Sequence, residues 1–252
     1  MANSPYAIAL AGKGGTGKTT VAGFLVKYLV LNGKKPVLAV DADANANLNE
    51  VLGLTVEETL GDAREEMKKG VASGMTKDVF MEMKLEQAVV EAEGYDLVVM
   101  GRPEGAGCYC AANTLLTNYL DRLMGNYAAV VMDNEAGMEH LSRMTTNNVN
   151  ALLVVSDSSR RGIQAAARIF ELANELSLKI EHKHLIVNQA QKGEIVDLTA
   201  AARDFGLELS GVIPEDPQVR EYDRTGKPTI TLDENNSAVR AAFDIFRRIT
   251  DL

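Results

Sequence analysis

The stretch Ala7-Ile-Ala-Leu-Ala-Gly-Lys-Gly-Gly-Thr-Gly-Lys-Thr-Thr20 decides the fold of this chain. An apolar run leads into a glycine-rich turn, and a segment with helical spacing follows from Lys18. Residues 12–19 match the spacing G-x-x-x-x-G-K-[ST]. In this strand–loop–helix order, that spacing predicts a loop that binds nucleotide phosphates.

The chemistry of the loop follows from its residue types. Glycines let backbone N–H groups turn toward an anion, and the following helix directs its positive end to the same point. Lys18 would place a charge beside the β- and γ-phosphates, and the Thr19 hydroxyl would ligate Mg²⁺. The residues expected to contact the nucleotide here are Gly12, Gly14, Gly15, Thr16, Gly17, Lys18, Thr19 and Thr20.

Composition is typical of a soluble globular enzyme, with 252 residues of which 46% are hydrophobic and 24% charged. We expect one domain over residues 1–252. The net charge of −9 argues against nucleic acid as a partner. No apolar run approaches the roughly 18 residues of a membrane helix. The first residues lack the pattern of a signal peptide, and two cysteines cannot build a disulfide scaffold, so we expect a cytoplasmic protein.

Short apolar runs alternate with segments of helical spacing along the chain. The expected strands are Tyr6–Ala11, Pro36–Val40, Asp96–Met100, Ala128–Met132, Ala151–Val155, His184–Val187 and Gly211–Ile213. The expected helices between them are Lys18–Leu31, Asn113–Met124, Gly162–Leu178 and Val196–Phe205. This alternation predicts an α/β fold of three layers, with a mostly parallel sheet of about seven or eight strands between helices.

Two segments stand apart from this alternation. Residues 55–93 are rich in Glu, Lys and Met, and we expect one or two amphipathic surface helices there rather than a dedicated partner site. At the other end, Val239, Phe243, Phe246 and Ile249 share one face of a predicted helix over Ser237–Leu252. That face is expected to dock on the core, and not on a membrane.

Lys13 is a residue that an ordinary phosphate loop does not need. In Lys13-Gly-Gly-Thr-Gly-Lys-Thr19 it resembles the deviant phosphate loop of the MinD/ParA and nitrogenase iron-protein superfamily. The resemblance implies a homodimer in which Lys13 reaches the nucleotide of the partner subunit. A second cation there would stabilise charge that develops during phosphoryl transfer.

Acidic residues follow two of the predicted strands. By the same resemblance, Asp43 in Val40-Asp-Ala-Asp43 orients or deprotonates the attacking water. Asp133 would hold a water of the Mg²⁺ shell, and Asp41 either does the same or only supports that shell. The resemblance therefore makes Lys13, Lys18 and Asp43 the catalytic residues of an ATPase.

Base recognition is expected at the ends of the last two predicted strands. Asn188 resembles the asparagine that contacts adenine in this superfamily, and a carboxamide can match the adenine edge. Pro214 and Asp216 would flank the same pocket. The chain has no guanine-specific N-K-x-D pattern, which favours ATP and ADP over guanine nucleotides.

Both cysteines of the chain lie in Gly101-Arg-Pro-Glu-Gly-Ala-Gly-Cys-Tyr-Cys-Ala-Ala-Asn113. Bridging Cys108 to Cys110 would strain a disulfide, but two thiolates can chelate a soft or borderline metal ion. A symmetric dimer would supply the four ligands of a complete site. Without further context, a chance pair of buried cysteines is an equally good interpretation.

With the deviant loop, the cysteine run resembles CooC-type accessory ATPases. That family assists nickel insertion into carbon monoxide dehydrogenase, with relatives that serve acetyl-CoA synthase. The resemblance implies Ni²⁺ or Zn²⁺ at Cys108 and Cys110 and one of these enzymes as client. Two alternatives stay open, an iron–sulfur reductive activator and a MinD/ParA-like positioning switch.

Overall fold

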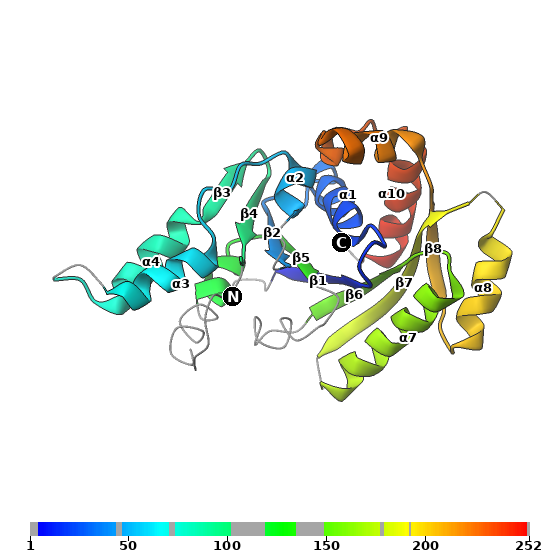
Figure 1. Cartoon of the computed structure of the whole chain (residues 1–252), viewed down its shortest axis with the longest axis horizontal. Coiled ribbons are helices and arrows are strands. Elements are labelled where there is room, and N and C mark those ends of the chain that lie inside the picture. Colours follow the sequence, from blue (N-terminus) through cyan, green and yellow to red (C-terminus); the bar gives the residue numbers. More distant parts are fainter. Residues whose placement is uncertain are drawn as a thin grey trace.

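Eight strands form one sheet through the middle of the computed structural model, which describes residues 5–43, 47–70, 74–101, 119–134, 149–176, 179–191 and 193–250 (Figure 1). The strands are β1 (Tyr6–Gly12), β2 (Val37–Ala42), β3 (Val89–Ala92), β4 (Tyr95–Val99), β5 (Ala129–Asn134), β6 (Val149–Ser156), β7 (Ile180–Ala190) and β8 (Leu209–Pro214). Their order across the sheet is β3-β4-β2-β5-β1-β6-β7-β8.

All neighbouring strands of this sheet pair in parallel, except β3 with β4. The central strand β1 aligns Ile8 with Val131 of β5 and with Ala151 of β6. All three side chains are fully buried, as expected for parallel strands covered on both faces. Parallel pairing also brings the carboxyl ends of β1, β2 and β5 to one edge of the sheet, which we call the nucleotide edge.

Helices cover both faces of the sheet and complete three layers (Figure 1). One face packs against α1 (Lys18–Leu31), α2 (Leu48–Leu52) and α10 (Ser237–Ile249). The other face packs against α3 (Leu60–Lys69), α4 (Lys77–Gln87), α7 (Arg160–Glu175) and α8 (Ile195–Asp204). Helix α9 (Pro217–Thr225) and the 3-10 turn η1 (Thr229–Thr231) lead from β8 to α10. The predicted α/β fold is confirmed.

The segment 55–93 contains the two expected helices, α3 and α4, and also a strand that we did not predict. Strand β3 pairs antiparallel with β4 through a hairpin that turns at Glu93 and Gly94. Gly94 has a φ of +86°, which a glycine adopts without steric cost. Four residues are too few to show the alternation by which a strand is recognised, so this edge strand was hidden in a polar segment.

The C-terminal helix docks on the core, as its apolar face predicts. Val239 and Phe246 of α10 are fully buried, and Ile249 packs against the same cluster. Tyr28 of α1 contacts Phe243 and Phe246, with ring centroids 5.4 and 5.7 Å apart. No helix in the described part of the chain has the length and apolar character to cross a membrane.

The helix predicted over residues 113–124 is present over 119–124, and its remainder lies outside the described residues. The helices predicted over 162–178 and 196–205 correspond to α7 and α8, whose ends differ by a few residues. Strand β7 begins four residues before the predicted run, because Ile180, His182 and Lys183 continue its ladder with β6.

Candidate functional site

The phosphate loop is the turn between β1 and α1, and two of its glycines, Gly12 and Gly17, lie in close contact with neighbouring atoms. A Cβ atom on Gly12 would lie 2.4 Å from the carbonyl oxygen of Val155 in β6. Gly17 has a φ of +75° and directly precedes Lys18, the first residue of α1. The loop therefore turns sharply into a helix whose first N–H groups face the nucleotide edge.

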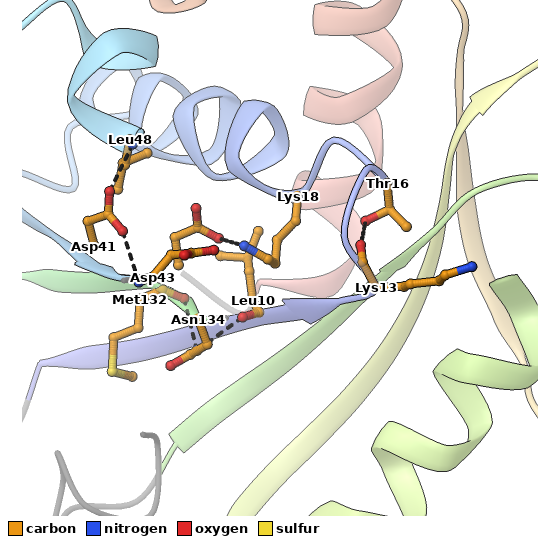
Figure 2. Close-up of polar contacts among 10 residues, drawn as sticks. Leu10, Lys13, Thr16, Lys18, Asp41, Asp43, Leu48, Met132 and Asn134 are labelled. Atoms are coloured by element: carbon orange, nitrogen blue, oxygen red, sulfur yellow. Dashed lines mark hydrogen bonds and ion pairs between the residues drawn. The ribbon is translucent and has the colours of Figure 1, made fainter. Parts of the chain in front are cut away.

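Thr16 is buried under this loop. Its hydroxyl donates to the carbonyl of Lys13 at 3.0 Å (Figure 2), and its own carbonyl accepts from the side-chain amide of Asn188 at 2.9 Å. The side chain of Thr16 thus shapes the loop. A direct contact between Thr16 and the nucleotide stays a prediction.

A pocket of about 590 Å³ opens at the nucleotide edge, a volume suited to a nucleotide. Asp43 lines it, as does every residue predicted to contact the nucleotide except Thr16. These lining residues are Gly12, Gly14, Gly15, Gly17, Lys18, Thr19, Thr20, Asn188, Pro214 and Asp216.

Lys18 and Asp133 form a buried ion pair at the floor of the site, with Nζ 2.6 Å from Oδ1. Asp133 is the penultimate residue of β5 and is fully buried. Its other oxygen, Oδ2, has no hydrogen-bond partner within the described residues. Burial raises the pKa of Asp133 above its usual value, and the Lys18 ammonium and the Thr19 hydroxyl offset part of that rise. A buried carboxylate with a spare acceptor beside Thr19 fits a Mg²⁺-bound water.

Asp41 is fully buried, and both of its carboxylate oxygens accept backbone N–H groups. Oδ1 accepts from Asp43 at 3.0 Å, and Oδ2 accepts from Leu48, the first residue of α2, at 2.9 Å (Figure 2). Burial raises the pKa of Asp41 to about 6. Asp41 therefore holds both Asp43 and the start of α2 in place. Its predicted contact with the Mg²⁺ shell stays a prediction.

Lys13 is exposed, and its side chain points away from Lys18 and Asp43 (Figure 2). Among the described residues it does not line the pocket of its own chain. This orientation leaves its ammonium group available to a second molecule.

The end of the pocket beside α9 is lined by residues that the sequence analysis did not predict to lie there. Val219, Arg220 and Tyr222 of α9 line it together with Lys227. Asp216 caps α9 by accepting from the N–H groups of Gln218 and Val219, and it also accepts from the Ser237 hydroxyl. The pair Asp216-Pro217 is a helix-start signal that could have placed α9 beside the pocket. The predicted base contacts of Asn188, Pro214 and Asp216 stay predictions.

Cys108 and Cys110 lie outside the described residues. The described residues alone contain no cluster of three or more His, Cys, Asp or Glu that could hold a metal ion. The chain approaches the cysteine run at the nucleotide edge. The N–H of Met100 donates to the carbonyl of Asp41 at 2.8 Å, and the Met100 carbonyl accepts from Gly61 at 2.9 Å.

The sequence-family model of the CobQ/CobB/MinD/ParA nucleotide binding domain matches residues 7–230 of this chain. The chain belongs to this family. It is 43% identical over 249 residues to an uncharacterized ATP-binding protein of Methanocaldococcus jannaschii, covering 96% of this chain and 97% of that protein. The carbon monoxide dehydrogenase accessory protein CooC of Rhodospirillum rubrum is 32% identical over 237 residues, covering 87% of each chain.

Solved structures agree with this assignment. MinD from Pyrococcus horikoshii, complexed with Mg-ADP, superimposes with a TM-score of 0.70 at 24% identity, covering 98% of this chain and 96% of that one. The members of this family are ATPases, and the chain is a nucleotide-binding P-loop ATPase with the fold of MinD and ParA.

Proposed function

We propose that this ATPase works as a nucleotide-dependent homodimer that binds Ni²⁺ or Zn²⁺ through Cys108 and Cys110. Its client would be carbon monoxide dehydrogenase or acetyl-CoA synthase, into which it assists nickel insertion. The observation that carries the proposal is the C-x-C run in a chain that is 32% identical to a carbon monoxide dehydrogenase accessory protein.

The hydrolytic step requires few groups, and the pocket supplies them. ATP would lie with its phosphates on the loop, where Lys18 leaves Asp133 to meet the γ-phosphate. Asp43 would orient the water that attacks the γ-phosphate, with ADP as the leaving group. Thr19, together with Asp133 through a water, would hold Mg²⁺, which would supply neutralisation of the phosphate charge. The partner's Lys13 would add a second cation, which its outward direction in one subunit supports (Figure 2).

The backbone of the nucleotide edge supports a link between hydrolysis and the metal. Asp41 holds Asp43 and Leu48 through its side chain and holds Met100 through its carbonyl. The cysteine run begins one residue after Met100. A movement of Asp43 on loss of the γ-phosphate would therefore reach the proposed metal-binding residues through the end of β2 and Met100. Such coupling is reciprocal, so metal should tighten the dimer as nucleotide changes metal affinity.

Anaerobic purification followed by metal analysis tests the metal site. We expect one Ni²⁺ or Zn²⁺ per dimer, lost in Cys108→Ser and Cys110→Ser but retained in Ser159→Ala, an exposed residue that caps α7. A brown, redox-active cluster would instead favour the reductive activator. Binding to lipid vesicles or DNA that is unchanged by both cysteine substitutions would favour the positioning switch. The similarity to MinD proteins is the reason for testing that alternative.

Substitution of Lys13 tests the shared site. Lys13→Gln should spare nucleotide binding and abolish turnover, because the partner's site loses its second cation. Lys77→Gln, which changes an exposed lysine at the start of α4, serves as the matched control. Preserved turnover in Lys13→Gln would show that hydrolysis does not use the partner's lysine.

A further inference from the structure

Strand β7 leaves its regular pairing with β8 at the nucleotide edge. The register shifts between Val187 and Ala190, and Gln189 has a φ of +56°. A residue with a side chain rarely adopts positive φ, so such a kink persists only where the surrounding structure holds it. The kink lies directly after Asn188, a buried polar residue that follows the apolar run Leu185–Val187.

The side chain of Asn188 packs on the phosphate loop. Its Nδ2 donates to the carbonyl of Thr16 at 2.9 Å, across 172 residues of sequence. A Cβ atom on Gly17 would lie 2.4 Å from the same Nδ2. The absence of a side chain at Gly17 is therefore what allows the carboxamide of Asn188 to reach the loop.

This contact fixes the direction of one phosphate-binding group. The peptide between Thr16 and Gly17 is planar, and in a trans peptide the C=O and N–H point in opposite directions. Because the Thr16 carbonyl points to Asn188, the N–H of Gly17 points away from Asn188. The Thr16 hydroxyl, bonded to the Lys13 carbonyl, holds the other side of the same turn.

We propose that Asn188 is a positioning residue for the phosphate loop, and that it strengthens the binding of polyphosphates whatever base they carry. Asn188 acts through the Thr16–Gly17 peptide, in addition to any contact with adenine. The proposal rests on nucleotide binding at this pocket and is independent of the proposed metal site.

Inorganic tripolyphosphate separates the two roles, because it has phosphates and no base. The affinities of ATP and tripolyphosphate are measured by calorimetry for the full-length protein and for Asn188→Ala. Loss of the amide leaves a buried carbonyl without its donor, so both affinities should fall by a similar factor of about 5 to 100. Asn150→Ala is the matched control, because its amide bonds Ala7 and Glu181 outside the pocket. It should leave both affinities unchanged.

Asn188→Ser covers the case in which the alanine variant does not fold. The serine hydroxyl can still act as a donor near the Thr16 carbonyl. This variant should show the same parallel loss at smaller size. If either variant weakens ATP binding while tripolyphosphate binding stays within about twofold of the wild type, the proposal is wrong and Asn188 only reads the base. A wild type that binds neither ligand would overturn the nucleotide site itself.

Discussion

The buried pair of Lys18 and Asp133 makes a quantitative prediction about the nucleotide-free protein. Removing one partner of a buried ion pair leaves an uncompensated charge, which typically costs about 3–5 kcal/mol. Lys18→Met should therefore lower the free energy of unfolding by about 3 kcal/mol or more at pH 8. The cost should shrink in acid, because burial already raises the pKa of Asp133 and the carboxyl can then become neutral.

A double-mutant cycle in urea, without nucleotide, measures the pair itself. Lys18→Met, Asp133→Asn and the double variant should give a coupling energy of about 2 kcal/mol or more. Arg247 and Asp244 form the control pair, with the same kind of contact at 2.8 Å but well exposed to solvent. Their coupling should stay at about 0–1 kcal/mol. Additive effects of the two buried substitutions would refute the reasoning.

Three further outcomes follow from single residues. Gly12→Ala should abolish nucleotide binding in a calorimetric titration, because the alanine Cβ would clash with the backbone of Val155, which cannot move aside. Normal affinity would contradict the close contact between Gly12 and Val155. Because the pKa of Asp41 is raised to about 6, the folded state binds a proton there more tightly than the unfolded state. The free energy of unfolding should thus fall by about 2 kcal/mol from pH 4 to pH 7 through this group, and equal pH slopes in wild type and Asp41→Asn would refute it. Phe246→Ala should cost about 3–5 kcal/mol in urea denaturation yet leave nucleotide affinity intact; a loss below 1 kcal/mol would mean that the core refills the space.

The phosphate loop and the alternating strands could be predicted because their signals are local. Residues 12–19 carry their chemistry in spacing alone, and the buried strands show apolar runs whatever they pair with. Strand β3 was missed because four residues at a sheet edge carry no such run.

Contacts between distant segments had no sequence signal. Lys18 was predicted to contact the nucleotide phosphates, and Asp133 was predicted to hold a water of the Mg²⁺ shell. Their pairing across 115 residues depends on β1 and β5 being neighbours in the sheet. The contact of Asn188 with Thr16 likewise depends on how the end of β7 meets the phosphate loop. From the sequence, these side chains could be predicted as polar groups near the nucleotide. Only the fold shows which groups they pair with or hydrogen-bond.

The place of β1 in the middle of the sheet has a dynamic consequence. Edge strands can detach in partial openings, whereas a strand flanked by β5 and β6 loses its ladder only when the whole sheet comes apart. Amide hydrogens of β1 should therefore exchange with deuterium only through global unfolding. The phosphate loop should thus be anchored to the slowest-exchanging part of the molecule.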